Sequence, residues 1–327
     1  MKKAGILLGF ICLVLTYFSI QPPVVSSADV KYPTKTIKFI VPTPAGGPQD
    51  IICRKLANFA GPYLGQEVIV ENKTGAGSVV GVRFVLKSTP DGYTIGAVSA
   101  SPVILSPHIR EVDYDTTTDI TPIIQYAYAD HPLAVPTDSP IKTFKEFIEE
   151  ARKREVTFAG QELTGATVAV ARLAAVEKLK IKIVPFGGTA PSVTAVLGGH
   201  TDAICCSGIY EYVRSGKLRL IFHTGGIRNK EFPEIPTLKE LGYDIEVPMF
   251  YGIIAPKGLP EQIQKKLEEV FTRAVRDPSF EPTVHNAGWV FVYKNSEDFG
   301  KLIKEEYKRS EKELRELGLG RYAKEKK

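Results

Sequence analysis

The chain reads Val41-Pro-Thr-Pro-Ala-Gly-Gly-Pro-Gln-Asp50 and, further on, Glu71-Asn-Lys-Thr-Gly-Ala-Gly-Ser78. Each of these glycine-rich stretches lies between a run with the composition of a β-strand and a run with the spacing of an amphipathic helix. A tight turn that opens a helix presents free backbone N–H groups, and the helix dipole adds positive potential at the same point. Two such turns in succession predict a protein that binds a small anion.

The N-terminus has the pattern of a secretory signal. Lys2 and Lys3 precede an apolar run over 4–20, and Ser26-Ser-Ala28 supplies the small residues that a signal peptidase needs. We expect a signal peptide over 1–28 with cleavage after Ala28. Because the apolar run is long for a signal and short for a membrane-spanning helix, a retained anchor stays as the alternative.

The rest of the composition indicates an exported protein of two lobes that does not bind nucleic acid. The remaining chain of about 300 residues is too long for one core. Removing Lys2 and Lys3 lowers the net charge from +5 to +3, because residues 1–28 hold no other charged side chain. This mild excess of positive charge does not indicate binding to nucleic acid. Cys53, Cys205 and Cys206 would survive cleavage, and this odd number predicts buried thiols rather than a disulfide framework.

A strand, a polar turn and a helix follow one another repeatedly, which predicts α/β lobes with mostly parallel sheets flanked by helices. We expect strands at 36–41, 67–70, 93–98, 133–135, 156–159, 181–184 and 218–223. Helices are expected from an Asp50 cap to a stop at Gly61-Pro62, from Ser78 through Leu86, over 144–153 after a Thr143 cap, from the loop 160–167 to Leu179, and over 191–197. In such sheets ligands bind at the carboxyl ends of strands, where the glycine-rich turns lie.

The last third of the chain is expected to be structural. Two amphipathic helices, 260–275 and 297–317, carry apolar residues on one face and charges of both signs on the other. Charges that alternate in sign indicate a solvated face and not a binding patch.

Motifs for the common cofactors and for catalysis are missing from the sequence. Gly75, Gly77 and Gly81 are spaced one residue too far apart for a dinucleotide fingerprint, and no P-loop occurs. The five histidines lack the spacing of a zinc site, and there is no nucleophile elbow. We therefore expect no cofactor, no metal and no catalytic residue. A carboxylate held by backbone N–H groups fits the glycine-rich turns better.

Short motifs follow one another along nearly the whole mature chain. The early ones are Tyr32-Pro33, Ile40-Val-Pro-x-Pro-Ala-Gly-Gly-x-x-Asp50, Val70-Glu-Asn-Lys-Thr-Gly-Ala-Gly77, Pro90-Asp-Gly-Tyr-Thr94 and Tyr114-Asp115. The later ones are Gly187-Gly-Thr-Ala-Pro191, Leu197-Gly-Gly-His-x-Asp202, Ser215-Gly-Lys-Leu-Arg219, Pro236-Thr-Leu238 and Ala255-Pro256. In these motifs and in their order the chain resembles the substrate-binding proteins of tripartite tricarboxylate transporters, the Bug-type periplasmic solute receptors.

The resemblance implies a two-lobed periplasmic-binding-protein fold, type II-like, with two crossovers between the lobes. Lobe 1 would comprise 29–125 and 226–327, and lobe 2 would comprise 126–225. The lobes would close around a small organic anion, a mono-, di- or tricarboxylate. The protein would deliver this ligand from the periplasm to the membrane permease subunits of the transporter, and it would not be an enzyme.

The resemblance also implies which loops hold the ligand. Members of the family bind a ligand carboxylate through backbone amides, small hydroxyls and ordered waters. Carried over to this sequence, the contacts in lobe 1 are Thr43, Pro44, Ala45, Gly46, Gly47, Asp50, Gly75, Ala76, Gly77, Ser78 and Ser99. Those in lobe 2 are Gln161, Thr164, Gly165, Thr167, Phe186, Gly187, Asp202 and Cys206.

Lobe 2 departs from the family pattern. The family often has Gly-Ser-x-x-His-Leu-Ala where this chain has Val168-Ala-Val-Ala-Arg-Leu-Ala174, and Tyr-Lys-Gly where it has Phe186-Gly-Gly188. It also commonly has a tryptophan near Phe250. The hydroxyl and the lysine are thus missing or moved. Phe186 and the loss of the lysine lead to the hypothesis of a ligand with a less polar distal group, such as a short aliphatic or aromatic acid.

Several alternatives stay open at the level of sequence. Asp50 is either a helix N-cap or the counterion of an ammonium group, and the second role would imply an amino-acid ligand. The chain is alternatively an exported α/β enzyme acting on small carboxylates, with Ser207 or a cysteine as nucleophile. A third function is that of a receptor subunit that senses its ligand and signals to a membrane kinase.

Overall fold

The computed structural model describes residues 31–129, 131–160, 164–186, 188–245, 247 and 249–323. The chain divides into two units, Met1–Lys31 and Tyr32–Lys327, and the description below concerns the second. The expected signal over 1–28 lies outside the described residues. In the part of the chain that is described, no helix is both long and apolar enough to cross a membrane.

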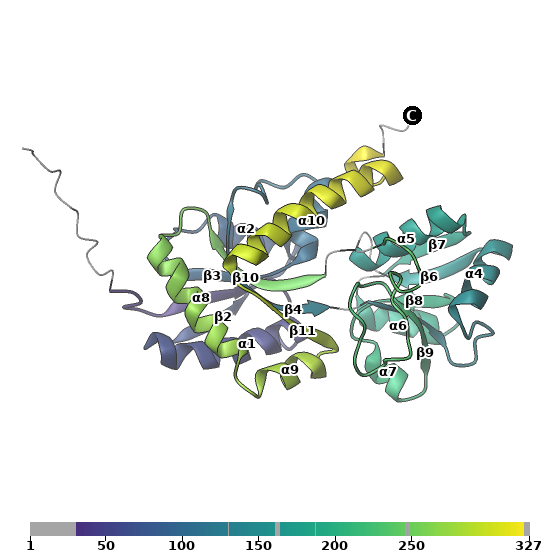
Figure 1. The fold of residues 1–327 in the computed structure, drawn as a ribbon, viewed down its shortest axis with the longest axis horizontal. Helices are drawn as coiled ribbons and strands as arrows, with labels where there is room; N and C mark the ends of the chain where they lie inside the picture. The colour runs from purple at the N-terminus through teal and green to yellow at the C-terminus, as the bar shows by residue number, and fades with distance from the viewer. Residues whose placement is uncertain are drawn as a thin grey trace, which may run out of the picture. The chain divides into compact units, whose positions relative to one another are not determined.

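The first sheet has six strands in the order β11-β4-β10-β3-β1-β2 (Figure 1). Strands β1 to β4 run in one direction, and β10 and β11 run in the opposite direction. Their bounds are β1 Ile37–Val41, β2 Val68–Asn72, β3 Thr94–Ser99, β4 Ile120–Ala129, β10 Phe250–Pro256 and β11 Trp289–Lys294.

The second sheet has five strands in the order β7-β6-β8-β5-β9. Only β5 runs against the other strands of this sheet. Their bounds are β5 Pro132–Pro136, β6 Val156–Gly160, β7 Ile181–Pro185, β8 Ala203–Cys205 and β9 Leu218–His223. The chain passes from one sheet to the other after β4 and returns between β9 and β10. The predicted two-lobed α/β fold with two crossovers is thus confirmed, whereas the predicted lobe boundaries at 125 and 225 stay predictions.

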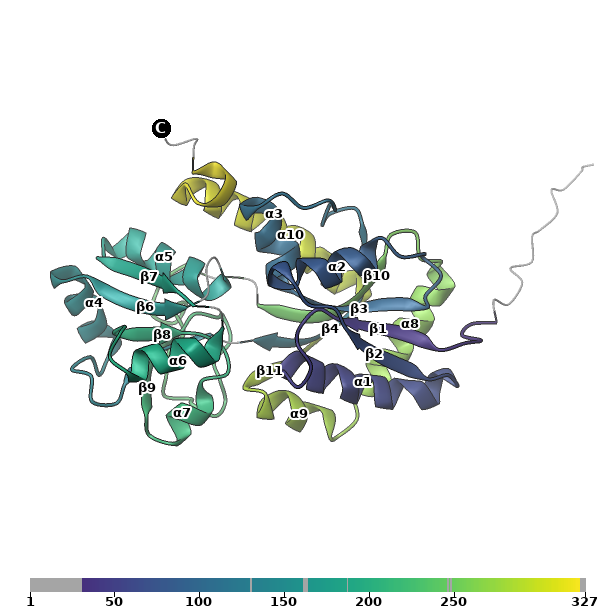
Figure 2. The same cartoon turned by 180° about the vertical axis from the view of Figure 1, so that it is seen from behind.

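Helices flank both faces of each sheet (Figures 1 and 2). Against the first sheet, α2 and α10 lie on one side and α1, α8 and α9 on the other. Against the second sheet, α4 and α5 lie on one side and α6 and α7 on the other. Their bounds are α1 Pro48–Leu64, α2 Val79–Leu86, α3 Ser106–Ile109, α4 Phe144–Lys153, α5 Gly165–Glu177, α6 Thr189–Leu197, α7 Tyr210–Arg214, α8 Glu261–Val275, α9 Phe280–Asn286 and α10 Ser296–Leu317. Short helical turns lie at Ala76–Ser78, Ser101–Leu105 (a π-helix) and Gly320–Tyr322.

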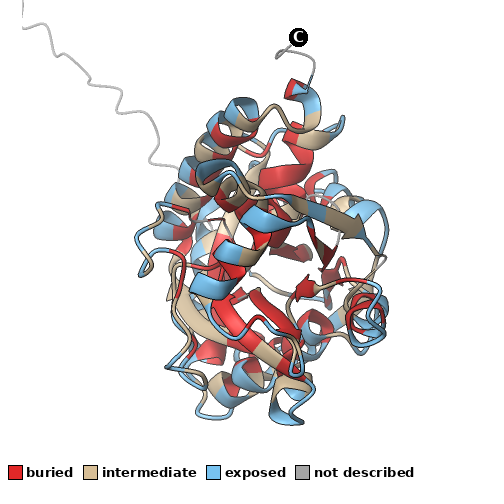
Figure 3. Ribbon diagram, turned by 90° about the vertical axis from the view of Figure 1, so that its right-hand side faces the viewer, coloured by how far each residue is buried: buried red, intermediate tan, exposed pale blue. Residues whose placement is uncertain are grey.

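Successive residues of a central strand point to opposite faces and enter different cores. On β6, Phe158 packs edge-on against Phe147 of α4 at 5.8 Å between ring centroids. The next residue, Ala159, belongs to the apolar cluster on the other face, with Val193 and Val196 of α6. Figure 3 accordingly shows the strands mostly buried and the helices buried on one side only. This double burial explains why the strands read as continuous apolar runs in the sequence.

The expected strands are confirmed to within two residues at their ends, but β4, β8, β10 and β11 were not expected. Two predictions about α1 were wrong. The helix begins before Asp50, with Gly47 as N-cap and Pro48 as its first residue. It also continues through Pro62 to Leu64, because the left-handed Gly65 ends it and Pro62 removes only one hydrogen bond from the last turn.

Candidate functional site

A cavity of about 750 Å³ is lined by loops of both sheets. These loops follow β1, β2 and β3 in the first sheet and β6, β7 and β8 in the second, so that the cavity lies at the carboxyl ends of parallel strands. From the first sheet and its loops come 43–49, Gly77, Ser78, 99–101, Leu105, 249–251 and Trp289. From the second come Thr164, Gly165, Thr189, Ala190, Ser207, Gly208, Glu211 and Tyr212, while His131 lies between β4 and β5.

The loop between β1 and α1 brings a helix start to the cavity. Gly47, the N-cap of α1, provides no side-chain cap, and Pro48 at the first position has no N–H of its own. Gly46 has a φ of +78°, a backbone conformation that glycine adopts without strain. The first N–H groups of α1 therefore lack a side-chain acceptor beside the cavity.

The loop between β2 and α2 brings a second helix start. Gly77 has a φ of +62°, and Ser78, the N-cap of α2, has a φ of +76°. A serine held in the left-handed region costs about 1–3 kcal/mol, and such strain concentrates at functional sites. Gly75 and Ala76, which precede these two residues, do not line the cavity.

A buried carboxylate ties the first loop to the end of β2. Asp50, only 2 % exposed, accepts hydrogen bonds from the Gly46 N–H at 2.9 Å, from Arg54 Nε at 2.9 Å and from Asn72 Nδ2 at 2.8 Å. Asn72 Nδ2 also donates to the Thr43 carbonyl at 2.9 Å. Burial by itself raises the pKa of the Asp50 carboxyl, but these hydrogen bonds outweigh it and hold the pKa below its usual value. Asp50 thus fixes the loop from within and does not face the cavity.

The loops of the second sheet bring two helix starts to the cavity, one with a side-chain cap and one without. Thr164 caps α5: its hydroxyl accepts from the Thr167 N–H at 3.4 Å, and its own N–H donates to the Thr167 hydroxyl at 2.8 Å, so the start of this helix has a side-chain cap. Gly188 caps α6 without a side-chain hydrogen bond. Thr189 opens α6 and donates from its hydroxyl to the Ser207 carbonyl at 3.1 Å. The amino end of α6 is therefore the better anion site on this side of the cavity.

Two stacked rings form part of the wall on the side of the first sheet. Tyr251 of β10 and Trp289 of β11 lie 3.8 Å apart between ring centroids, at an interplanar angle of 23°. These strands are separated by β4, where Tyr251 pairs with Ala127 and Trp289 with Ala129. The two alanines lie on one face of β4 and are small enough for the rings to meet above them.

Of the residues expected to bind the ligand, ten line the cavity and seven others do not. Those at the cavity are Thr43, Pro44, Ala45, Gly46, Gly47, Gly77, Ser78, Ser99, Thr164 and Gly165. Those away from it are Asp50, Gly75, Ala76, Thr167, Phe186, Asp202 and Cys206. Gln161 and Gly187 lie outside the described residues.

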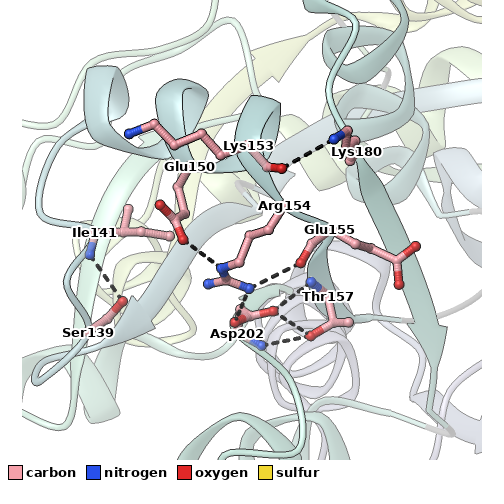
Figure 4. A network of polar contacts seen from close by, with 9 residues as sticks. All are labelled: Ser139, Ile141, Glu150, Lys153, Arg154, Glu155, Thr157, Lys180 and Asp202. Atoms are coloured by element: carbon pink, nitrogen blue, oxygen red, sulfur yellow. Dashed lines mark hydrogen bonds and ion pairs between the residues drawn. The ribbon is translucent and has the colours of Figure 1, made fainter.

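Asp202 has structural partners that explain its position. It precedes β8 and so lies at the amino end of that strand, the edge opposite the cavity. Its carboxylate accepts from the Thr157 N–H at 2.8 Å and hydroxyl at 2.7 Å, and pairs with Arg154 at 2.9 Å (Figure 4). Cys206 is 5 % exposed, and burial raises the pKa of its thiol to about 11.

Sequence reasoning missed the contribution of the last third of the chain. Phe250, Tyr251 and Trp289 line the cavity, although that part was expected to be structural. Gln49 was missed as well, in the middle of the first glycine-rich stretch. The family's tryptophan near Phe250 was the available signal, because Trp289 of β11 brings an indole to the ring of Tyr251, the neighbour of Phe250 on β10.

Comparison with known proteins identifies the family. The model of the tripartite tricarboxylate transporter family receptor matches residues 52–319. The chain belongs to this family. A Cupriavidus necator relative, described as "UPF0065 protein in gbd 5'region", is 35% identical over 303 residues, covering 91% of this chain and 92% of that protein. A solute-binding protein structure from Polaromonas has a TM-score of 0.76 at 28% identity, covering 87% and 99% of the two chains. The structure of the periplasmic binding protein BugD also gives 0.76 at 28% identity, covering 88% and 99%.

The receptor is accordingly a solute-binding protein and not an enzyme. Ser207 lines the cavity, and its backbone carbonyl accepts a hydrogen bond from the Thr189 hydroxyl. Within the described residues, no cluster of three histidine, cysteine, aspartate or glutamate side chains could hold a metal ion.

Proposed function

We propose that this receptor binds a small organic carboxylate in the cavity and delivers it to the permease subunits of a tripartite tricarboxylate-type transporter. One observation carries the proposal: the starts of α1, α2 and α6 converge on one cavity without side-chain caps. N–H groups at such starts favour an anion. Each charge-assisted hydrogen bond contributes about 1.5–3 kcal/mol, so that three or four suffice for micromolar affinity after the costs of association.

The proposed contacts come from both sides of the cavity. On the side of the first sheet they are the backbone of 43–47, together with Gly77, Ser78 and Ser99. On the other side they are Thr164, Gly165 and the start of α6. Ligand binding would draw the two lobes together about the two crossover segments, as in other hinged receptors.

We further propose that the receptor works in the periplasm. The signal pattern over 1–28 supports export, and the similar BugD is described as periplasmic. Fractionation of a Gram-negative host that expresses the full chain tests this proposal. The receptor should be released with the periplasmic contents, and N-terminal sequencing should begin after Ala28. Recovery with the cytoplasmic fraction would contradict it.

A thermal-shift screen tests the ligand class. Carboxylates that bind the folded receptor should raise its melting temperature in a concentration-dependent manner, because only the folded state binds. The matched control for each acid is its uncharged primary amide, which should give no shift at the same concentration. Stabilisation by neutral sugars and by no carboxylate would contradict the proposal. Uptake into vesicles that contain the permease, with and without the receptor, tests delivery.

A further inference from the structure

A second cavity, of about 230 Å³, lies against α10, and we call it the α10 cavity. Its lining residues come from β4, β10, β11 and α10, and from the segment that leads from β9 to β10. Phe250 of β10 lines it and packs edge-on against Phe299 of α10, at 5.2 Å between ring centroids, so the cavity lies on the face of the first sheet that α10 covers (Figure 1). Among the described residues, it shares only Met249 and Phe250 with the cavity of about 750 Å³ described above, the first cavity. The α10 cavity is therefore a separate space, which the proposed function leaves unused.

The α10 cavity is small, and its walls are mostly apolar. In addition to Met249 and Phe250, its apolar side chains are Ile227, Val247, Val292 and Leu302. Sites for drug-sized ligands have volumes of roughly 300–1,000 Å³, so this cavity suits a smaller molecule, of about one aromatic ring with a short chain. Removing such an apolar body from water favours its binding between these side chains.

Gln125 of β4 brings an unused hydrogen-bond acceptor to the wall of the α10 cavity. This side chain is only 1 % exposed. Its Nε2 donates to the Ala127 carbonyl at 3.3 Å, whereas its Oε1 is buried and accepts no hydrogen bond within the described residues. Because an unsatisfied buried acceptor is unfavourable, a hydroxyl donated to Gln125 Oε1 would be stabilising. The cavity therefore favours a ligand that carries a hydroxyl group.

Lys294 of β11 brings an available positive charge to the same cavity. The other two charged side chains that line it, Glu306 and Arg309 of α10, pair with each other at 2.5 Å. Lys294 is partly exposed, and it makes no ion pair within the described residues. An ammonium group in this position attracts a carboxylate, and its partial exposure lets the charge of the ligand stay near water.

We infer that the α10 cavity is a second ligand site, for a small hydroxylated monocarboxylate whose apolar body is about one ring in size. The carboxylate pairs with Lys294, the hydroxyl donates to Gln125 Oε1, and the body contacts the apolar walls. The site is distinct from the first cavity and does not depend on the proposed function. Either can therefore fail without the other.

NMR titration of the receptor, purified after export and labelled with [methyl-13C]methionine, tests this inference. Met249 is the only methionine after Met1, and it lines both cavities, so one methyl signal reports binding in either of them. The probes are 4-hydroxyphenylacetate, phenylacetate, which lacks the hydroxyl, and 4-hydroxyphenylacetamide, which lacks the charge. The first should bind about ten-fold more tightly than phenylacetate and about five-fold more tightly than the amide. Absence of any shift at millimolar concentrations of all three would overturn the inference.

Two variants decide in which cavity a probe binds. Lys294→Gln should weaken the binding of 4-hydroxyphenylacetate about five-fold and remove its advantage over the amide. Thr43→Val changes the first cavity and should leave this binding unchanged. Lys304→Gln on the exposed side of α10 is the matched control and should have no effect. The inference requires a titration phase that Lys294→Gln weakens and Thr43→Val does not, and a titration without such a phase overturns it.

Gln125→Met tests the role of the acceptor. It keeps the length of the side chain and removes the amide, so 4-hydroxyphenylacetate and phenylacetate should bind with equal affinity in the α10 cavity. If the ten-fold preference remains, Gln125 is not the acceptor and this assignment is wrong. If Gln125→Met does not fold, Lys294→Gln still decides whether the site exists, because it alters a partly exposed side chain.

Discussion

Arg172 of α5 donates a 2.8 Å hydrogen bond to the carboxylate of Glu313 in α10, and so connects a helix of the second sheet with one that flanks the first. Arg172 also donates to the Asp244 carbonyl at 2.9 Å. The two charged side chains are largely buried, at 20 % and 9 % exposure. Burial raises the pKa of the Glu313 carboxyl, and the neighbouring Arg172 and Arg309 offset only part of this rise. Desolvation therefore offsets much of the stability that the pair contributes, and loss of one partner leaves the other charge buried and unpaired.

Arg172→Ala should destabilise the receptor by roughly 2 kcal/mol at pH 7.5, between the values for exposed and buried pairs. A carboxyl whose pKa is raised in the folded state favours folding at low pH and opposes it as the pH rises through that pKa. The loss in the variant should thus be smaller at pH 5 than at pH 7.5, because a falling pH favours protonation of Glu313 and so removes the unpaired charge. Urea unfolding of both proteins at the two pH values measures this difference.

Glu313→Gln is the matched control for this pair. It removes the charge together with its desolvation cost, so the variant should be within about 1 kcal/mol of the parent at pH 7.5. The double variant should resemble Glu313→Gln rather than Arg172→Ala. If Arg172→Ala lowers the free energy of unfolding equally at both pH values, the contact of Arg172 with the Asp244 carbonyl, and not the ion pair, accounts for the destabilisation.

Asp50→Asn should weaken the binding of every carboxylate by a similar factor, about ten-fold, because it loosens the first loop rather than removing a ligand contact. It should also destabilise the fold by about 1–2 kcal/mol, since an amide cannot accept all three hydrogen bonds. Because the pKa of Asp50 is lowered in the folded state, its carboxylate stabilises the fold above the pKa of the unfolded carboxyl. This stabilisation is lost as the pH falls through the folded pKa. The difference in stability between parent and variant should therefore narrow as the pH falls through the folded pKa of Asp50.

Asn72→Ala is the second variant that tests the same network, since it leaves Asp50 charged and removes the contact with the Thr43 carbonyl. It should reproduce the affinity loss across the same set of carboxylates. Calorimetry with an amino acid and with the matching acid that lacks the ammonium group separates the two roles of Asp50. A loss confined to the amino acid would make Asp50 an ammonium counterion, against the position that the structure gives it.

The sequence predicted the parallel core of the fold because those strands are buried on both faces and read as apolar runs between glycine turns. The strands β4, β8, β10 and β11 were not predicted, for physical reasons. Strand β4 contains Pro122 and Gln125, and β10 contains Gly252 against the ring of Phe299, so neither has simple alternation. Strand β8 has only three residues and gives too short a pattern. Their positions are set by contacts with segments far away in the chain.

The candidate site was predictable where it is made of backbone and was missed where it is made of distant side chains. The turns at Gly46, Gly47 and Gly77 follow from local conformation, which the sequence encodes directly. The stack of Tyr251 on Trp289 depends on the pairing of both strands with β4, which no local pattern reveals. Asp202 was misplaced because a motif does not say whether a residue lies at the amino or carboxyl end of its strand.

Thr43→Val should separate ligand binding from stability. The Thr43 hydroxyl is buried without a hydrogen-bond partner among the described residues, and Thr43 lines the cavity. Replacing an unsatisfied hydroxyl by a methyl group of the same shape should leave the unfolding free energy unchanged or slightly higher. Carboxylate affinity should nevertheless fall about ten-fold, because the ligand loses one donor. Chemical denaturation and calorimetry measure the two effects, with the exposed Thr118→Val as control. Unchanged affinity would mean that Thr43 contributes only shape.

The thiols should be inert in the folded receptor. Cys53, Cys205 and Cys206 form no disulfide within the described residues and are at most 5 % exposed. Burial raises the pKa of Cys53 to about 12 and that of Cys206 to about 11, so neither forms the reactive thiolate at pH 8. A chromogenic disulfide reagent should give no rapid reaction with the native protein. Fast modification of one thiol would contradict this burial.

In denaturant the same reagent should count the thiols and thereby locate the mature N-terminus. The whole chain has four cysteines, and the fourth, Cys12, lies in the apolar run of the expected signal. Cleavage after Ala28 removes Cys12, so receptor released from the periplasm should titrate three thiols per chain once it is unfolded. A full-length chain purified from membranes should titrate four. Three thiols in a periplasmic sample therefore support cleavage independently of N-terminal sequencing, whereas four would favour a retained anchor.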